Sequence, residues 1–444
     1  MSPVVEQIWN GRSFHFVGIG GAGMSGLARI ALELGATVTG SDSATGGAIE
    51  DLCALGAVIH ADHNEAHVPV DAELVYSSAI DADNPERAVA AARGQTELHR
   101  SDLLGEMTRL KPTIAVTGTH GKTTTSAMVV SALRGAGVDP GWVIGAPLAG
   151  GEASAGWGTS PWLVVEADES DRSLLGLECV IAVVTNCELD HHATYSSLED
   201  LRTTLTQFLA KAMHAVIWDQ PELISLAPAE AALHPYRAAD ASSKDGRASF
   251  TWREQVVNLL VPGLHNATNA SGALEAAALT GADQQGLCDG IATFAGTSRR
   301  FEYIGRSRAG AQVFDDYAHH PTEVAATIAA ARSFGAERVL VAFQPHLFSR
   351  TEALSAEFGS ALASADAALV ADIYPAREAG KDFPGVTSEL IVSAGNSGSS
   401  QPILSASGDL PATAAAIVEM SREGDLILLM GAGDITSLGA GLVS

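Results

Sequence analysis

A glycine loop ending in Gly121-Lys122-Thr123 carries the strongest chemical signal in this sequence of 444 residues. An apolar, β-branched run at residues 113–117 precedes the loop and a helical pattern follows it, which is typical of a phosphate-binding loop. In such loops backbone N–H groups surround the phosphate oxygens, the lysine lies near the β- and γ-phosphates, and the hydroxyl binds Mg²⁺. The spacing departs from the common form, since Val116 stands where the first glycine is expected. We expect the phosphates of a nucleotide to contact Gly118, Thr119, His120, Gly121, Lys122, Thr123 and Thr124.

A cluster of acids follows the predicted strand at residues 162–166. The motif EADESD, residues 166–171, holds four acids in six positions, and such a cluster is costly unless cations neutralise it. A solvated acidic loop is the alternative interpretation. The carboxyl end of a strand is where α/β sheets bind ligands, and Mg²⁺ prefers a few carboxylates together with phosphate oxygens and water. The position therefore favours a magnesium site in this loop.

Histidines follow the next apolar run, at residues 180–185. His191 in the motif TNCELDHH is a candidate metal ligand or proton carrier, although a structural histidine is the commoner case. A second pair, His319 and His320, makes a zinc site with His191 and His192 conceivable. The phosphate-binding loop favours Mg²⁺ instead, and no close pair of cysteines supports zinc.

A second glycine turn lies near the N-terminus, where G-x-G-x-x-G at residues 18–23 follows a strand at residues 14–17 and precedes a helix. Glycines there allow a tight turn and let the helix N-terminus approach a diphosphate, while Asp42 stands where such folds often hold a ribose hydroxyl. NAD, another nucleotide diphosphate, and close packing of the helix on the strand all remain open. With two glycine turns, we expect two phosphorylated compounds to bind, one per domain.

Two arginines follow strands in the last third of the sequence, Arg350 in QPHLFSR and Arg377 in YPAREA. An arginine at the carboxyl end of a strand can hold a carboxylate through two parallel hydrogen bonds. Each arginine alone would more often be a surface residue, but two in equivalent positions indicate a carboxylate site.

The elements that position these residues alternate throughout, since short β-branched runs are followed by alanine-rich helical stretches. This alternation predicts α/β units around parallel sheets. Strand patterns restart near residues 110 and 296, so we expect three domains, 1–110, 111–296 and 297–444. In the middle domain we expect a turn-rich, irregular stretch at residues 239–249 and a helix at residues 266–279.

Composition excludes several classes of function. The net charge of −26 argues against broad electrostatic binding of nucleic acid or of an anionic membrane. The longest apolar runs are far shorter than the roughly 20 residues that span a bilayer, and the N-terminus lacks the pattern of a signal peptide. Four scattered cysteines suit a reducing compartment. We expect a cytoplasmic monomer or weak homodimer.

The motifs occur in an order that resembles the Mur ligase family, and the resemblance spans residues 14–433. They are GIGGAGMSG, GTHGKTTT, EADESD, TNCELDH, PGLHNATNA, GTSRRFE, DDYAHHPTEV, QPHLFSR and YPAREA. The resemblance implies a Rossmann-like N-terminal domain for a UDP-sugar, a central P-loop ATPase-type domain with a parallel sheet for ATP and Mg²⁺, and a Rossmann-like C-terminal domain for an amino acid. The reaction implied is ATP-dependent ligation of L-alanine to UDP-N-acetylmuramate through an acyl phosphate.

Residue roles also follow from the resemblance. It implies catalytic roles for Lys122, Glu166, His191 and His346, and metal binding by Thr123, Glu166 and His191. Beyond the loop, ATP would contact Asn266, Asn269, Arg299, Arg300 and Asp316. The UDP-sugar would contact Gly18, Gly20, Gly21, Gly23, Met24, Ser41 and Asp42, and the amino acid His346, Arg350 and Arg377. A family member that attaches a recycled tripeptide is the nearest alternative, and an NAD-dependent oxidoreductase a more remote one.

Overall fold

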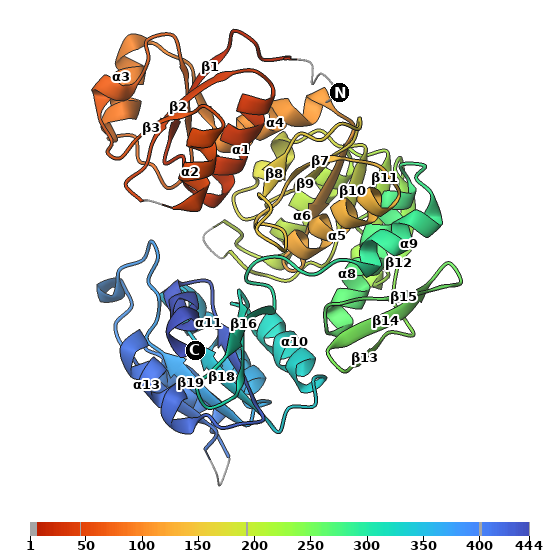
Figure 1. Cartoon of the computed structure of the whole chain (residues 1–444), viewed down its shortest axis with the longest axis vertical. Helices are drawn as coiled ribbons and strands as arrows, with labels where there is room; N and C mark the ends of the chain where they lie inside the picture. The colour runs from red at the N-terminus through yellow and green to blue at the C-terminus, as the bar shows by residue number, and fades with distance from the viewer. Residues whose placement is uncertain (1–6, 45, 192–193, 399–401, 444) are drawn as a thin grey trace. The chain divides into compact units, whose positions relative to one another are not determined.

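The computed structural model describes residues 7–44, 46–191, 194–398 and 402–443. The chain forms two compact units. Figure 1 labels the helices and strands along the chain. The first unit comprises Met1–Arg237 and Asn269–Ile291, and the second comprises Ala238–Thr268 and Ala292–Ser444. The prediction of a multidomain α/β protein with parallel sheets is confirmed, whereas the boundaries near residues 110 and 296 stay predictions.

The first unit begins with a five-stranded parallel sheet in the order β3-β2-β1-β4-β5. Its strands are β1 (Ser13–Val17), β2 (Thr37–Ser41), β3 (Val58–His60), β4 (Glu73–Tyr76) and β5 (Glu97–His99). Its helices are α1 (Ala22–Glu33), α2 (Gly47–Ala54), α3 (Pro85–Arg93) and α4 (Arg100–Leu110). Strand order reverses between β1 and β4, and ligands of such sheets bind outside the carboxyl ends at this reversal. The first glycine turn follows β1 and therefore lies at that edge.

A seven-stranded sheet follows in the same unit, in the order β12-β11-β10-β6-β9-β7-β8. Its strands are β6 (Thr113–Thr117), β7 (Gly141–Val143), β8 (Ala155–Gly156), β9 (Leu163–Glu166), β10 (Ile181–Val184), β11 (His214–Trp218) and β12 (Ala232–Tyr236). Only β7 and β8 pair antiparallel. Because β6 lies between β9 and β10, the phosphate-binding loop, the acidic loop and the histidine loop leave neighbouring strands at the same edge.

Helices cover this sheet and complete the unit. They are α5 (Lys122–Gly135), α6 (Leu198–Leu209), α7 (Pro221–Ile224) and α9 (Gln284–Ala292). The helix predicted at residues 266–279 is α8 (Leu264–Ala278), which starts in the second unit and continues into the first from Asn269. The two sheets of the first unit share one apolar core, in which Leu27 of α1, Leu103 of α4 and Trp157 are all buried. Helix α1 packs on β8 so closely that a Cβ atom on Gly26 would lie 2.9 Å from the Cβ of Ala155.

The second unit contains a small antiparallel sheet of β13 (Ser242–Lys244), β14 (Arg247–Trp252) and β15 (Gln255–Asn258). The prediction of an irregular stretch at residues 239–249 is therefore wrong, because most of it forms this hairpin. Asp245 and Gly246 connect β13 to β14 with φ angles of 52° and 70°. Asp-Gly favours this turn because a tight two-residue hairpin needs positive φ at both positions.

The main sheet of the second unit has six strands in the order β16-β17-β21-β18-β19-β20. They are β16 (Glu302–Arg306), β17 (Gln312–Asp316), β18 (Arg338–Phe343), β19 (Ala367–Ala371), β20 (Leu404–Gly408) and β21 (Asp425–Met430). All neighbours are parallel except β16 and β17. Its helices are α10 (Pro321–Arg332), α11 (Phe348–Leu362), α12 (Glu389–Gly395), α13 (Leu410–Met420) and α14 (Leu438–Leu442).

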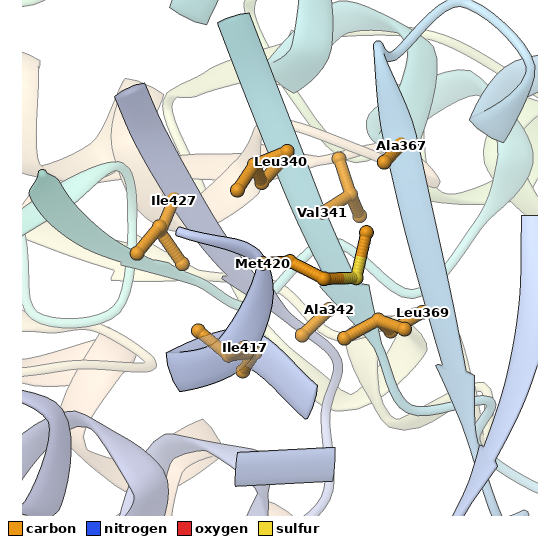
Figure 2. A pocket seen from close by; sticks show the side chains of 8 residues that line it. All are labelled: Leu340, Val341, Ala342, Ala367, Leu369, Ile417, Met420 and Ile427. Atoms are coloured by element: carbon orange, nitrogen blue, oxygen red, sulfur yellow. The ribbon is translucent and has the colours of Figure 1, made fainter. Parts of the chain in front are cut away.

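One cavity of this unit, of about 10 Å³, lies between helix α13 and strands β18, β19 and β21 (Figure 2). Its lining is wholly apolar: Leu340, Val341, Ala342, Ala367, Leu369, Ile417, Met420 and Ile427. Because it offers no polar group and hardly the space of one water molecule, it is a packing gap. In the part of the chain that the structure describes, no helix combines the length and apolar character needed to cross a membrane.

Candidate active site

The phosphate-binding loop connects β6 to α5 and depends on two glycines in the left-handed region. Gly118 has φ 128° and Gly121 has φ 79°. A Cβ atom on Gly118 would lie 2.2 Å from the hydroxyl oxygen of Thr185, and one on Gly121 would lie 2.8 Å from Oδ1 of Asn269. Helix α5 begins directly after Gly121, so the N–H groups of its first turn are directed toward the loop, as anion binding requires.

The loop after β10 holds the phosphate-binding loop in place. The backbone N–H of His120 donates to the side-chain oxygen of Asn186 over 2.8 Å, and Thr185 donates to the carbonyl of His120 over 2.6 Å. Thr119 donates to the carbonyl of Glu188 over 2.9 Å. Asn186 was given no role from the sequence, although its position in TNCELDH, directly after a strand, was a usable signal.

Lys122 is folded back into the site. Its Nζ donates to the carbonyl of Gly118 over 2.8 Å and lies 2.8 Å from Oε2 of Glu169. Burial opposes the charge of Lys122, but the nearby carboxylates of Glu169, Asp168 and Glu166 outweigh it and raise its pKa. Lys122 is therefore a permanent cation at the place where the β- and γ-phosphates are predicted.

Glu166 and Thr123, two of the predicted metal ligands, lie together. One oxygen of Glu166 accepts a hydrogen bond from the Thr123 hydroxyl over 3.0 Å, and the other accepts one from the N–H of Gly145 over 2.7 Å. A Cβ atom on Gly145 would come within 2.7 Å of Glu166 and 3.1 Å of Thr123 Oγ1, so glycine keeps these oxygens accessible.

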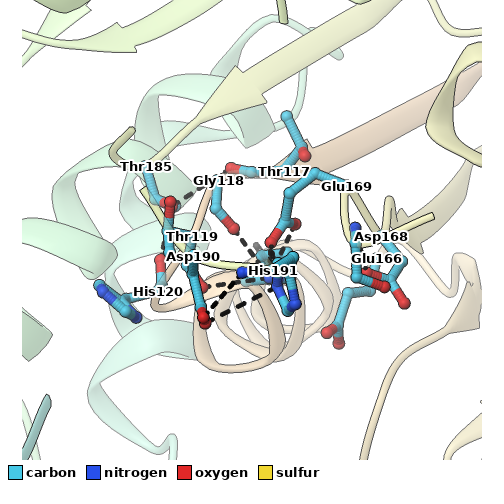
Figure 3. A network of polar contacts seen from close by, with 12 residues as sticks. Thr117, Gly118, Thr119, His120, Glu166, Asp168, Glu169, Thr185, Asp190 and His191 are labelled. Atoms are coloured by element: carbon cyan, nitrogen blue, oxygen red, sulfur yellow. Dashed lines mark hydrogen bonds and ion pairs between the residues drawn. The ribbon is translucent and has the colours of Figure 1, made fainter. Parts of the chain in front are cut away.

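His191, the third predicted ligand, contacts a different acid. Its Nε2 lies 3.2 Å from Oε1 of Glu169 (Figure 3). The backbone of His191 has φ 54°, an uncommon value for a non-glycine residue that is enriched at functional sites. Its neighbour in the histidine pair, His192, lies outside the described residues.

Glu169 is the central residue that sequence reasoning missed. Its carboxylate contacts both Lys122 and His191, its carbonyl accepts the Tyr195 hydroxyl over 2.5 Å, and it is fully buried. The acidic motif contained it, but spacing alone did not distinguish it from its acidic neighbours.

The first glycine turn is held by Asp42. One oxygen of Asp42 accepts the N–H of Gly20 over 2.8 Å, and the other accepts the N–H of Ala44 over 2.8 Å. The carbonyl of Ser41 accepts the N–H of Gly18, which has φ 73°. Asp42 thus shapes the turn, and its predicted contact with the sugar nucleotide stays a prediction.

A cavity of about 220 Å³ lies between the start of α1 and the loops at the carboxyl edge of the central sheet. Ala22 and Gly23 at the start of α1 line one part of it, and Gly145, Glu166 and Asp168 of the central sheet line another. The N-terminal end of α1 and the acidic loop therefore face one shared space. The remaining lining residues are Leu27, Arg100, Ser101, Leu104, Val143, Ile144, Ser173 and Leu177.

The second unit brings part of the predicted amino-acid site together after β18 and β19. The His346 ring stacks on Tyr374 with centroids 5.7 Å apart, and its Nδ1 lies 3.3 Å from a guanidinium nitrogen of Arg350. Arg350 is buried and Arg377 is exposed. Leu347 has φ 73° and Ala376 has φ 49°, so both loops contain a residue in the left-handed region.

The residues predicted to contact ATP from the second unit are engaged within that unit. Asp316 accepts the N–H groups of Phe301 and Ala318, both over 2.8 Å, and burial raises its pKa to about 6. Arg299 donates to the carbonyl of Gly431 over 2.6 Å. Arg300 lies 3.7 Å from a Glu323 oxygen, and buried Asn266 donates to the carbonyl of Pro262. Their contacts with ATP stay predictions.

Two family models match the sequence. Residues 13–112 match the model described as "Mur ligase family, catalytic domain", and residues 299–433 match "Mur ligase, glutamate ligase domain". The UDP-N-acetylmuramate–L-alanine ligase of Streptomyces griseus is 42% identical over 449 residues, covering 96% of this chain and 95% of the relative. The ligase of the same name from Laribacter hongkongensis is 41% identical over 455 residues, covering 96% of each.

Solved structures are similar over nearly the whole chain. The UDP-N-acetylmuramate–alanine ligase of Thermotoga maritima superposes with a TM-score of 0.81 at 26% identity, covering 97% of this chain and 98% of that one. A murein peptide ligase from Psychrobacter arcticus superposes with a TM-score of 0.71 at 25% identity, with the same coverage.

Proposed function

Because the chain belongs to the Mur ligase family, we propose that it joins L-alanine to UDP-N-acetylmuramate, with ATP as the phosphoryl donor and Mg²⁺ as the metal, in peptidoglycan precursor synthesis. The observation that carries the proposal is the cavity shared by the N-terminal end of α1 and by Glu166. A ligase of this kind must present a sugar nucleotide to a triphosphate. Within one unit, this cavity extends from the N-terminal end of α1 to Glu166, whose carboxylate accepts the hydroxyl of Thr123 next to the phosphate-binding lysine.

The sugar nucleotide would place its diphosphate at the first turn of α1, where N–H groups without intrahelical partners favour an anion. Its lactyl carboxylate would extend through the cavity toward Glu166 and Thr123. Because the cavity of about 220 Å³ is smaller than the roughly 300–1,000 Å³ of a typical small-molecule pocket, it would hold only part of the sugar nucleotide.

ATP would bind the loop from Gly118 to Thr124, with Lys122 moving from the Gly118 carbonyl to the phosphates. Asn269 supports this assignment, since its side chain lies against Gly121 at the base of α5. The ion pair with Glu169 compensates the charge of Lys122 and keeps its Nζ beside the phosphate-binding loop.

The donor atoms fit Mg²⁺. Glu166 offers a carboxylate and Thr123 a hydroxyl, both hard oxygen ligands, and the ATP phosphates and water would supply the rest. His191 would complete the set from the neighbouring loop. When bound, Mg²⁺ supplies charge neutralisation on the transferred phosphoryl group.

The proposed reaction has two steps. A lactyl carboxylate oxygen attacks the γ-phosphorus, the bond to the ADP oxygen breaks, and an acyl phosphate forms. Lys122 and the loop N–H groups stabilise the charge on the moving phosphoryl group. The amine of L-alanine then attacks the acyl carbon, phosphate leaves, and the amide loses a proton. His191 and His346 are the candidate proton acceptors.

The carboxylate of L-alanine is assigned to the second unit. Arg350, held beside His346, and Arg377 after β19 provide the guanidinium groups that bind carboxylates through paired hydrogen bonds. Positioning the amine against the acyl phosphate then converts a bimolecular step into an effectively unimolecular one.

Phosphate release tests the function. We expect release only when ATP, Mg²⁺, UDP-N-acetylmuramate and L-alanine are all present, with one phosphate per amide formed. D-glutamate and the tripeptide replace L-alanine in parallel reactions. Turnover with the tripeptide but not with L-alanine would identify the recycling activity instead, and NAD reduction without phosphate release would refute the ligase proposal.

A further inference from the structure

Arg100, the first residue of α4, is the one basic residue among those that line the shared cavity. The sequence motifs assigned it no role. The other charged lining residues are Glu166 and Asp168, both acidic. A cavity that receives a doubly charged diphosphate and a carboxylate needs a cation on its wall, and Arg100 supplies it.

The position of Arg100 is unfavourable for its own helix. The N-terminal turn of a helix carries partial positive charge, so acidic residues are favoured there and a cation is not. Helix stability therefore does not account for an arginine here, and a residue that breaks a local rule is often a functional one.

The ion pairs of Arg100 are long enough that a substrate anion could replace them. One guanidinium nitrogen lies 3.4 Å from Asp168 and 3.8 Å from Asp171, both longer than a charge-assisted hydrogen bond between arginine and carboxylate. The other nitrogen reaches the first turn of α1, because a Cβ atom on Gly23 would lie only 2.9 Å from it. The guanidinium thus stands between the acidic loop and the N-terminal end of α1.

We propose that Arg100 binds an anionic group of the UDP-sugar, exchanging its long ion pairs with Asp168 and Asp171 for a direct contact with the substrate. The inference rests on the proposed function. The anion is either the diphosphate, at the start of α1, or the lactyl carboxylate, on the side of the acidic loop. In both cases Arg100 determines sugar-nucleotide affinity and contributes nothing to ATP or L-alanine binding.

The test compares Arg100→Met with the wild-type protein by calorimetry, in Mg²⁺ and a non-hydrolysable ATP analogue. The ligands are UDP, UDP-N-acetylglucosamine and UDP-N-acetylmuramate, of which only the last carries the lactyl carboxylate. We expect the dissociation constant of UDP-N-acetylmuramate to rise about 10- to 100-fold, the effect of losing a hydrogen bond between charged groups. If the dissociation constants of all three ligands rise equally, Arg100 binds the diphosphate. If only that of UDP-N-acetylmuramate rises, Arg100 binds the lactyl carboxylate.

Two further variants separate substrate binding from a structural role. Arg109→Met removes an exposed arginine from the same helix and should leave all three affinities unchanged. Asp171→Asn breaks one ion pair of Arg100 but leaves the guanidinium in place, so affinity should stay equal or increase. If Arg100 only joins the two sheets, Asp171→Asn will weaken binding in parallel with Arg100→Met.

Unchanged affinity of Arg100→Met for every ligand, with normal folding, overturns the inference. Failure of the proposed function is distinguishable, because the wild-type protein would then bind no UDP-N-acetylmuramate and release no phosphate.

Discussion

At the scale of single residues, Lys122 is a cation whose charge is compensated by carboxylates of the protein itself. Lys122 pairs with buried Glu169, and Glu169 also contacts His191. Removing one partner of such a buried pair leaves the other uncompensated, which is costly. We therefore expect a substitution of Lys122, Glu169 or His191 to change the electrostatic environment of the other two side chains.

Lys122→Met should lower kcat for phosphate release by about 10²- to 10³-fold, because it removes a cation that stabilises the transferred phosphoryl group. Steady-state kinetics at saturating ATP measures the effect. Lys244→Met, at an exposed position in the β13–β14 hairpin, is the matched control and should retain wild-type kcat. A Lys122→Met protein with near-normal turnover would be incompatible with the proposed mechanism.

At the scale of elements, a buried polar network joins β1, β2 and α3 behind the first glycine turn. Glu86 accepts hydrogen bonds from Ser41 over 2.6 Å and from His63 over 3.0 Å, and lies 3.4 Å from His15. Burial alone would raise the pKa of Glu86, but the contacts with His15, Ser41 and His63 lower it to about 2. Since the Ser41 carbonyl also holds the N–H of Gly18, the network supports the turn.

Glu86→Gln should destabilise the N-terminal sheet. The folded-state pKa is depressed from 4.5 to about 2, so the ionised network contributes stability above pH 4.5 that is lost as pH falls toward 2. The loss at pH 7 should be on the order of 3 kcal/mol. Hydrogen exchange of β1 and β2 amides measures it, and the difference from wild type should narrow only below pH 4.5.

Asp71→Asn, an exposed carboxylate in the same part of the chain, is the control and should change exchange little. Equal destabilisation by both substitutions would contradict a specific role for the Glu86 network.

At the scale of the whole molecule, the acidic loop is compensated by the protein itself. Lys122 pairs with Glu169, Arg100 with Asp168, and the N–H of Gly145 and the hydroxyl of Thr123 with Glu166. We therefore expect the folded state not to depend on a metal ion, although the proposed reaction does.

Removing divalent cations with a chelator should abolish phosphate release and leave the circular dichroism spectrum and thermal unfolding midpoint unchanged. Adding Mg²⁺ with ATP at 100 times its dissociation constant should then stabilise the protein by about 2.7 kcal/mol. Scanning calorimetry measures the unfolding midpoint after chelation and the stabilisation by Mg²⁺ and ATP. Unfolding on chelation alone would show that the metal is structural and contradict this account.

The sequence by itself determined the elements and the kind of chemistry. The strand at residues 113–117, its glycine loop and the following helix are local patterns, and β6 and α5 match them. The Asp245-Gly246 turn is also a local pattern, since these two residues favour a two-residue hairpin connection. The prediction of irregular structure there is wrong because it did not use this preference.

Only the tertiary structure decided which polar groups meet. Glu169 lies 47 positions from Lys122, and Asp168 lies 68 positions from Arg100. These pairings depend on β9 lying beside β6 and on α4 packing near the acidic loop, and strand order and helix packing arise from the burial of apolar surface by the whole unit. The sequence records residue types and local spacing, so it could indicate an acidic loop and a phosphate-binding loop. It could not indicate which acid pairs with Lys122 or with Arg100.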